Sequence, residues 1–566
     1  MAPPAVNPLV AEALSRLFGS EEGADCDIQF YLEGGEEGGG GAVLGPLIPA
    51  HSLVLRPACE RFRAQLNRWQ PSPGACTDVA PATPQGSWAQ RVLRVTQAKE
   101  TAGGSLVRSA HTAQATDKAG SRPLLRVPLG SEAELPAARL ALRFAYTGQP
   151  SQIHASSVRE ALEVLRAGDY LAIEGCAAAC SQWLADRLAA TEAAAGSSAA
   201  PAEPAVLQLY ACEELWRPSA SDPSFAAVLS AAKAQLVRHF RSTLKTLNSF
   251  YLTKQLEALP AAGLEALLES DDLGTDSEDS VLTLLATWMR ANWARTDAAT
   301  RQRLCGLVRL TQLSPQAVSC LLLPLAADFD THGLEQQAGW FPMTVMEAAH
   351  VVSYHSASEP WQKQAFAPDH RLSSWPGWHS TSPRKQCVPE TGLHFPWSIS
   401  KEELRAKLLG LPPGKTAQAY AVFGGGSMLL AARGFVWAVP VEYTHGKAAA
   451  GLFLRTQIPE AYKVPDSRLA GYQERAVPSF ATCIDARLTA NRRQGGEVSS
   501  ASVYSYSQAD FTRVGSGWGL PAALPLSAQQ PIVAMMAAGG NVLAPWAEYA
   551  HEGSAVTGTL TLLPPK

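Results

Sequence analysis

The sequence predicts a multidomain protein in which an α/β region, an all-α region and an all-β region follow one another. Three patterns support this order. Cys26–Leu32 alternates apolar and polar residues, as a half-buried strand does. Apolar residues recur at helical spacing in segments such as Val281–Trp293. Beyond Pro383, short apolar runs are separated by glycine-rich turns, which is typical of a β-sandwich.

The composition indicates a globular protein and narrows the range of partners. The chain has 566 residues, enough for several domains. Lys and Arg together number 47 against 51 Asp and Glu, giving a formal net charge of −4. Because proteins that bind polyanions carry a strong basic excess, we expect no direct binding of nucleic acid. No apolar run approaches the length that spans a bilayer, so we expect no membrane association.

The first region, residues 1–190, reads as a compact α/β domain with a low-complexity insertion at about 69–122. Strands are predicted at Cys26–Leu32 and Leu124–Leu129, on either side of that insertion. A glycine-rich loop follows the first strand. Ala137–Tyr146 has the spacing of an amphipathic helix, and Thr147-Gly148 closes it. Two further helices are predicted at Val158–Leu165 and Cys176–Leu188.

The remainder divides into two larger regions joined by irregular segments. Residues 191–204 read as a linker and 205–330 as a helical domain. Within it, the acidic segment Glu269–Asp279 is interpreted as a solvated turn that charges the start of the next helix. Residues 331–382, rich in Pro and Trp, read as an irregular linker, and 383–566 as the β-sandwich.

Several motifs in this order resemble those of known families. Asp25-Cys26-Asp27-Ile28, Ile48–Phe62, Leu142–Gly148 and Ala167–Cys180 resemble the successive segments of a BTB/POZ domain. The helical stretch 205–330 is similar to the BACK domain that often follows BTB. The tail is similar to the C-terminal, MATH-like region of plant light-response BTB proteins, in the motifs Pro383–Val388, Phe423–Gly426, Gly451–Leu454, Gly515–Gly519 and Pro545-Trp546.

This resemblance implies a substrate adaptor of a cullin-3 RING E3 ubiquitin ligase. Its BTB domain would bind cullin-3 and form a homodimer, and its C-terminal domain would capture an unidentified target protein. Such an adaptor needs no cofactor and no catalytic residues of its own, and it works in the reducing interior of the cell, in the nucleus or cytoplasm. The alternative is a BTB-mediated dimeric scaffold or transcriptional co-regulator without a ligase role.

The resemblance implies a cullin-binding groove that is lined by four side chains. Aromatic and aliphatic anchors suit a groove that receives a helix, because they bury a large area with few rotors to freeze. Tyr146 is expected at the interface, since it precedes a glycine turn. Phe62 can belong either to the groove or to the core. The predicted cullin-binding residues are Phe62, Leu66, Tyr146 and Tyr170.

Dimerisation is assigned to the N-terminal segment and the first strand. Leu9, Leu14 and Leu17 lie near one face of a helix that packs on the partner subunit in BTB proteins, or else folds back on its own domain. Asp27 lies near the charged pocket of such domains and is either structural or part of the dimer interface.

No arrangement of residues predicts an enzyme or a metal site. Cys176 and Cys180 have no second pair of ligands nearby, so we interpret them as small buried side chains. His51 lacks a nucleophile and a carboxylate partner and is interpreted as a structural histidine bonded to nearby backbone. The tail tryptophans are interpreted mainly as core, with one or two exposed on a peptide-binding surface: Trp375, Trp378, Trp397, Trp437, Trp518 and Trp546.

Overall fold

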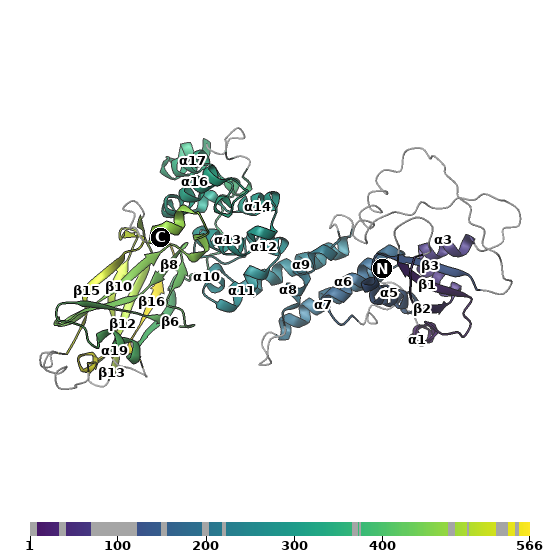
Figure 1. The fold of residues 1–566 in the computed structure, drawn as a ribbon, viewed down its shortest axis with the longest axis horizontal. Helices are drawn as coiled ribbons and strands as arrows, with labels where there is room; N and C mark the ends of the chain where they lie inside the picture. Colours follow the sequence, from purple (N-terminus) through teal and green to yellow (C-terminus); the bar gives the residue numbers. More distant parts are fainter. Residues whose placement is uncertain are drawn as a thin grey trace. The chain divides into compact units, whose positions relative to one another are not determined.

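The computed structural model divides the chain into two compact units, Met1–Gln235 and Leu236–Lys566 (Figure 1). The structure describes residues 8–32, 41–68, 122–148, 155–194, 203–217, 222–364, 372, 375–473, 481–494, 497–527, 542–549 and 554–565. The predicted insertion therefore lies outside the described residues, apart from Arg122, and so does most of the glycine-rich loop.

A three-stranded sheet in the order β2-β1-β3 forms the centre of the first unit. β1 (Cys26–Leu32) pairs antiparallel with β2 (Val43–Ala50) and parallel with β3 (Leu124–Leu129). Ile28 and Phe30 of β1 are fully buried, as their alternation predicted. The sheet therefore pairs segments from both sides of the insertion.

Two helices of this unit begin or end at capping residues, one of which, Gly148, was expected from the sequence. Gly148, with φ +61°, caps α5 after Thr147, and the Ser157 hydroxyl accepts the Glu160 amide at the start of α6. α7 continues to Ala194, into the predicted linker. The helices of this unit are α1 (Pro8–Leu17), α2 (Ser52–Ala58), α3 (Glu60–Arg68), α5 (Leu135–Thr147), α6 (Val158–Leu171), α7 (Cys176–Ala194) and α8 (Ala205–Tyr210), with α9 (Pro223–Phe240) crossing into the second unit.

The second unit begins with a helical region that includes α13 (Glu278–Asn292), a helix buried along most of its length, with polar and charged side chains at its start and mainly apolar ones from Val281 to Met289. The expectation of an irregular linker at 331–382 is wrong for much of that segment. It contains α17 (Val345–Ser356), which packs against α16 (Leu323–His332). A capping box at Thr344 and Glu347 starts that helix. The other helices are α10 (Thr243–Leu247), α11 (Phe250–Ala258), α12 (Ala261–Leu268), α14 (Ala298–Cys305), α15 (Pro315–Ala317), α16 (Leu323–His332), α17 (Val345–Ser356) and α18 (Glu359–Gln364).

Antiparallel sheets make up the C-terminal part of the same unit, as the short apolar runs predicted (Figure 1). One sheet has the order β5-β9-β10-β8-β7 with β15 paired to β10, another the order β13-β12-β16-β4-β6, and β11 and β14 form a third. The strands are β4 (Leu393–Ser400), β5 (Thr416–Tyr420), β6 (Val422–Phe423), β7 (Leu430–Ala432), β8 (Phe435–Ala438), β9 (Pro440–Thr444), β10 (Ala449–Gln457), β11 (Ala481–Thr482), β12 (Ala486–Gln494), β13 (Glu497–Tyr506), β14 (Thr512–Arg513), β15 (Gly517–Pro525) and β16 (Ser554–Leu562).

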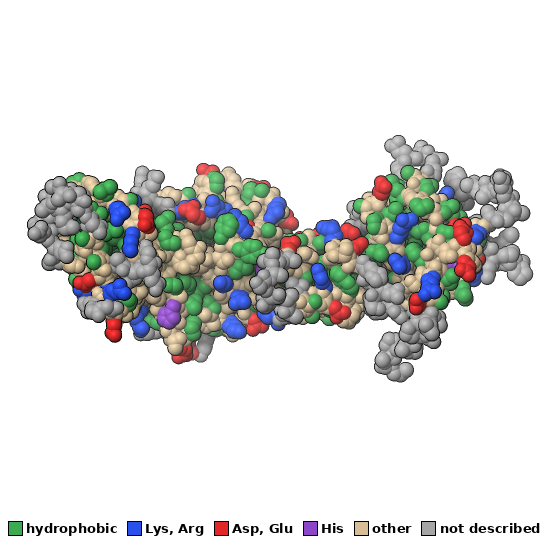
Figure 2. All heavy atoms as spheres, turned by 90° about the horizontal axis from the view of Figure 1, so that it is seen from below, with side chains coloured by type: hydrophobic (Ala, Val, Ile, Leu, Met, Phe, Trp, Pro, Cys, Tyr) green, Lys and Arg blue, Asp and Glu red, His purple; other side chains and the backbone are tan. Residues whose placement is uncertain are grey.

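One helix in this β-rich part was not predicted. α19 (Lys401–Leu408) begins directly after β4, where the Ser400 hydroxyl accepts the Glu403 amide. Among the described helices, none is both long and apolar enough to cross a membrane. On the face drawn in Figure 2, basic and acidic side chains are interspersed over the described surface, in keeping with the small net charge.

Candidate protein-binding and polar sites

Three of the four predicted cullin-binding side chains lie in the core of the first unit. Phe62 is 0% exposed, Leu66 3% and Tyr146 2%. α3 packs against β3 and α6, and α5 packs against α1, α2 and α6, so these side chains face their own domain. The expectation that Phe62, Leu66 and Tyr146 form an exposed groove is therefore wrong. Their aromatic and aliphatic character reflects packing.

Tyr170 is the predicted groove residue that reaches the surface. It is half-buried, and the Arg61 guanidinium lies 4.5 Å from the centre of its ring. The corner between α2 and α3 docks nearby on the turn after α6, where the Glu60 amide donates to the Ala172 carbonyl and the Glu174 amide to the Ala58 carbonyl. This corner and turn line a shallow cavity of about 260 Å³.

An exposed side chain that sequence reasoning missed lies on α2. Leu53 is 83% exposed, whereas the following Val54 and Leu55 are buried. A leucine on the outer face of a short helix interrupts the amphipathic pattern. That interruption is the sequence signal that could have predicted an exposed side chain here.

The proposed dimerisation residues meet their own domain in this single chain. Leu14 and Leu17 are half-buried on α1, which packs against α5, and the Phe18 ring meets the Tyr146 ring edge-on at 5.4 Å. The Leu9 side chain lies outside the described residues. Asp27 is 3.6 Å from the Arg122 guanidinium across the β1–β3 edge. Dimerisation through these residues remains a prediction.

His51 has the structural role expected of it. The Nε2 atom of the His51 ring lies 2.8 Å from the Glu22 carbonyl oxygen. The backbone amide of His51 donates to the Tyr146 hydroxyl at 3.0 Å. Burial raises the pKa of Tyr146 to about 12, so the hydroxyl stays protonated. The pair joins the start of α2 to α5.

A polar junction joins the helical and β-rich parts of the second unit, and it centres on the start of α13. The interpretation of Glu269–Asp279 as a solvated turn is wrong from Leu273 onwards, where all residues except the half-buried Ser277 are buried. Asp276 is 0% exposed, Glu278 4% and Asp279 2%. The partners of these carboxylates lie 31 to 157 positions away in the chain, which no local pattern reveals.

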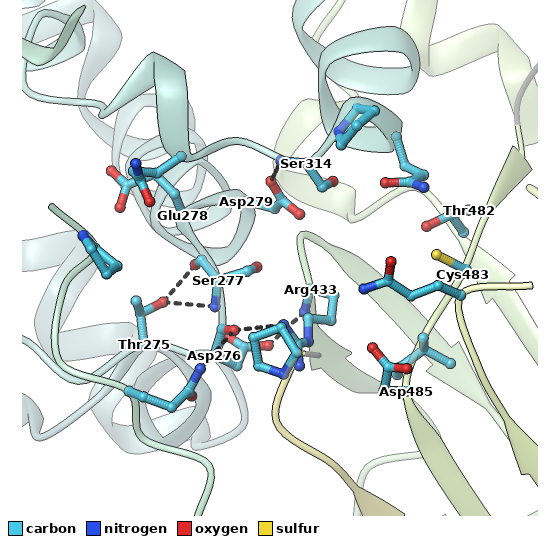
Figure 3. Close-up of a pocket in the computed structure, with 18 of the residues that line it drawn as sticks. Thr275, Asp276, Ser277, Glu278, Asp279, Ser314, Arg433, Thr482, Cys483 and Asp485 are labelled. Atoms are coloured by element: carbon cyan, nitrogen blue, oxygen red, sulfur yellow. Dashed lines mark hydrogen bonds between the residues drawn. The ribbon is translucent and has the colours of Figure 1, made fainter. Parts of the chain in front are cut away.

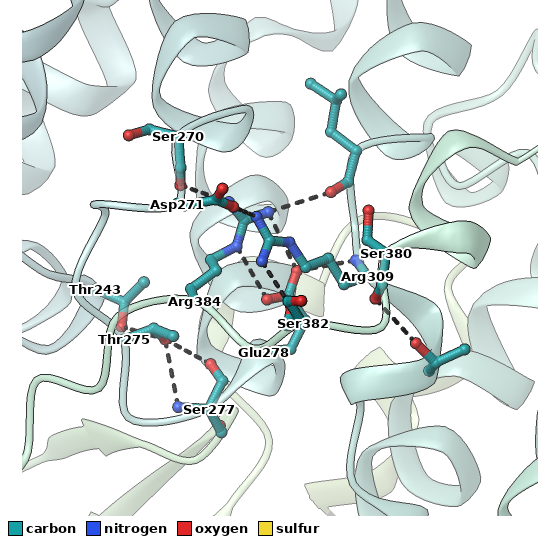
Figure 4. Close-up of polar contacts among 12 residues, drawn as sticks. Thr243, Ser270, Asp271, Thr275, Ser277, Glu278, Arg309, Ser380, Ser382 and Arg384 are labelled. Atoms are coloured by element: carbon teal, nitrogen blue, oxygen red, sulfur yellow. Dashed lines mark hydrogen bonds and ion pairs between the residues drawn. The ribbon is translucent and has the colours of Figure 1, made fainter.

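Glu278 is held by two arginines from elsewhere in the unit (Figure 4). Its carboxylate accepts the Arg309 amide at 2.9 Å and the Arg384 Nε at 3.0 Å. Arg384 also donates to the Ser270 and Leu307 carbonyls, so its guanidinium is fully used. The side chains of Arg384 and Glu278 are 0% and 2% exposed. This buried ion pair fixes the segment before β4 on the helical region.

The tight turn between β7 and β8 reaches the same place. Arg433 and Gly434 both have positive φ, +52° and +75°, as a two-residue hairpin of the right twist requires. The Arg433 amide donates to the Asp276 carboxylate at 2.6 Å, and its guanidinium donates to the Asp276 and Leu563 carbonyls. The Gly434 amide donates to the Ser280 hydroxyl and its carbonyl accepts from Thr283.

A polar pocket of about 310 Å³ opens beside this turn (Figure 3). Its lining includes Asp276, Asp279, Arg433, Cys483 and Asp485. Burial raises the pKa of Asp279 to about 6, although the Ser314 amide donates to its carboxylate at 2.8 Å. Among the described residues, no cluster of His, Cys, Asp and Glu can hold a metal ion.

The tryptophans of the tail divide as expected. Trp375 is 7% exposed, and Trp378, Trp397, Trp437 and Trp546 are 2% exposed or less. Trp518 on β15 is 48% exposed, next to Leu520 at 41%. Its indole Nε1 donates to the Tyr504 hydroxyl at 2.9 Å, and the Tyr506 hydroxyl donates to its carbonyl. These bonds tie β13 to β15 and hold the exposed ring in place.

The family model described as BACK, BTB And C-terminal Kelch, matches residues 225–322. This segment is therefore similar to a BACK domain. The matched residues lie within the predicted range 205–330 and run from α9 to the segment before α16. The match supports a BTB–BACK protein. No curated protein matches the chain.

Proposed function

We propose that this chain is the substrate-recognition adaptor of a cullin-3 RING E3 ubiquitin ligase. The observation that carries the proposal is the BACK domain, preceded by an α/β unit and followed in the same compact unit by antiparallel sheets. In this scheme the first unit is a BTB/POZ domain that binds cullin-3 and a second copy of the chain. The sheets form a MATH-like sandwich, similar to that of plant light-response BTB proteins, that captures the target.

The ligase would act through proximity. An adaptor raises the effective concentration of its target beside the ubiquitin-loaded enzyme, and a homodimer adds a second target site. The polar junction supports this role, because it joins the BACK domain and the sheets into one unit. A target held by the sheets would then keep a fixed orientation relative to the BACK domain.

The surface around Trp518 is the best-supported place for the target. Trp518 and Leu520 lie two residues apart on β15, so they share one face of that strand, and they are 48% and 41% exposed. Within the described residues, β13 pairs only with β12 and β15 only with β10, so each leaves one edge open. An extended peptide can add to such an edge while an aromatic side chain fixes its register.

The cullin-3 site is proposed on the exposed part of the first unit, around Leu53 and Tyr170. The purified full chain should bind the N-terminal domain of cullin-3, and mass determination should give two copies of each. Leu53→Asp and Tyr170→Ala should each weaken that complex at least tenfold while the circular dichroism spectrum is unchanged. Trp518→Ala is the matched control, because it changes an exposed side chain of the other unit and should leave cullin-3 binding intact.

Two other outcomes would each contradict one part of the proposal, either the ligase role or the homodimer. A dimer that ignores cullin-3 would favour the scaffold or co-regulator alternative. A monomer that binds cullin-3 would retain the ligase role and remove the homodimer.

A further inference from the structure

The polar pocket of the second unit carries an excess of negative charge. Four carboxylates and two guanidinium groups line it, which leaves a formal charge of −2. The lining residues come from the BACK domain, from the segment before β4 and from the sheets. The carboxylates belong to Asp276, Glu278, Asp279 and Asp485, and the guanidinium groups to Arg384 and Arg433.

Both guanidinium groups donate to other partners, although the Nε of Arg433 has no acceptor among the described residues. Arg384 donates to Glu278 and to two backbone carbonyls, and Arg433 donates to the Asp276 and Leu563 carbonyls. Glu278 and Asp276 are themselves saturated or nearly so by these and neighbouring donors. The charge that remains to be balanced therefore lies on the other wall of the pocket.

Asp485 is the unbalanced group. It is 6% exposed, and within the described residues no hydrogen bond or ion pair to its carboxylate is found, while the carboxylate oxygens keep some accessible surface in the pocket. Its backbone is fixed, because its carbonyl accepts the Leu563 amide at 2.8 Å just before β12 begins. Figure 3 shows its side chain among the residues that surround the pocket, on the side facing Arg433. A carboxylate that is largely removed from bulk water and has no ion-pair partner within the described residues is a favourable place for a cation to bind.

We propose that this pocket binds an ammonium or guanidinium group, with Asp485 as its main ion-pair partner and Asp279 as the second carboxylate. A volume of about 310 Å³ lies at the lower end of ligand pockets, which suits one long side chain rather than a larger molecule. We assign the group to a Lys or Arg side chain of a bound protein. That source rests on the proposed function, because a target held by the sheets would present such a side chain.

The first measurement is isothermal titration calorimetry of the full chain with three blocked amino acids. N-acetyl-L-arginine amide and N-acetyl-L-lysine amide should bind at least tenfold more tightly than the neutral N-acetyl-L-glutamine amide. This comparison needs no variant, so it does not depend on the folding of a mutant. Equal binding of all three, or no binding, would overturn the cation site.

Two variants then locate the site. Asp485→Asn keeps the size of the side chain and should weaken binding of the arginine amide at least tenfold. Glu497→Gln removes an exposed carboxylate of β13 outside the pocket and should have no effect. If Asp485→Asn binds as tightly as the wild type, the assignment to Asp485 is wrong.

The source of the cation is tested with a peptide. A blocked pentapeptide with one Arg between alanines should bind more tightly than the arginine amide, because flanking backbone adds contacts. Equal affinity would overturn the assignment to a protein side chain in favour of a small free amine. None of these measurements involves cullin-3, so failure of the pocket and failure of the ligase role are distinguishable.

Discussion

The two units of the chain bury charge to different extents. Among described residues of the first unit, the buried Asp, Glu, Lys and Arg side chains are Arg166 and Asp222, and its other buried polar side chains are His51, Thr147 and Ser181. The corresponding residues of the second unit are Asp276, Glu278, Asp279, Arg301, Arg309, Asp328, Arg384 and Asp485. Apolar packing tolerates many shapes, whereas buried charges need particular partners. The first unit thus depends on burial, and the junction of the second depends on matched polar contacts.

The largest effect is expected from breaking the buried ion pair. Arg384→Ala leaves the Glu278 carboxylate buried without its main partner, so the free energy of unfolding of the second unit should fall by about 3–5 kcal/mol. Calorimetry of the full chain measures this as a lower and broader transition. Arg303→Ala breaks an ion pair whose arginine is 50% exposed and should cost about 0–1 kcal/mol. Equal costs would mean that the buried pair does not specify the junction.

A smaller effect is expected at the hairpin turn. A Cβ at Gly434 would lie 2.6 Å from the Cβ of Asp279, and φ is +75° there. Gly434→Ala should therefore lower the free energy of unfolding by about 2–4 kcal/mol, through backbone strain and overpacking. Gly446 has φ +89° and open space around its Cβ position, so Gly446→Ala measures the backbone part alone. If both variants lose the same amount of stability, the turn does not press on the start of α13.

The third prediction concerns pH. Because burial raises the pKa of Asp279 from 3.8 to about 6, the folded protein holds this proton more tightly than the unfolded chain does. The stability from this group is full below the unfolded pKa and is lost as pH rises to about 6. Asp279→Asn keeps an acceptor for the Ser314 amide and removes that loss, so it should gain on the order of 1–3 kcal/mol relative to wild type between pH 4 and 7.

An exposed acid provides the opposite control for this pH profile. The pKa of Asp297 is lowered, chiefly by the Thr300 amide that donates to it. Its contribution is present above the unfolded pKa and is lost as pH falls, so Asp297→Asn should change the profile in the reverse direction. Denaturant unfolding at a series of pH values measures both variants. A flat difference between Asp279→Asn and wild type would contradict the burial of an ionisable carboxyl at this position.

Sequence patterns predicted the helices and strands that depend on neighbouring residues. They did not predict the contacts between residues far apart in the chain. The strand Leu124–Leu129 and the helix closed by Gly148 follow from periodicity and capping, which act over a few residues. The acidic run before α13 also has a local interpretation, a solvated turn, and that interpretation failed at Glu278. Its partner Arg384 is 106 residues away, and a single sequence contains no signal that pairs them.

The candidate sites show the same limit. Tyr146 and Phe62 have the chemistry of interface anchors, but aromatic residues serve cores equally well, and only packing distinguishes the two. Exposure of Leu53 and Trp518 is likewise set by which neighbours cover them. Asp485 gave no signal in the sequence, since its isolation follows from the pocket around it.

An effect no larger than that at Asp279 is expected in the first unit, where a single hydroxyl takes part in the packing. Tyr146→Phe keeps the ring against Phe18 but leaves the His51 amide without its acceptor, which should lower the free energy of unfolding by about 1–3 kcal/mol. Tyr251→Phe in the second unit changes a side chain that is 53% exposed and should cost less than about 0.5 kcal/mol. Chemical denaturation measures both. If Tyr146→Phe is neutral in stability yet weakens cullin-3 binding, Tyr146 acts at the interface after all, and the first unit must open to expose it.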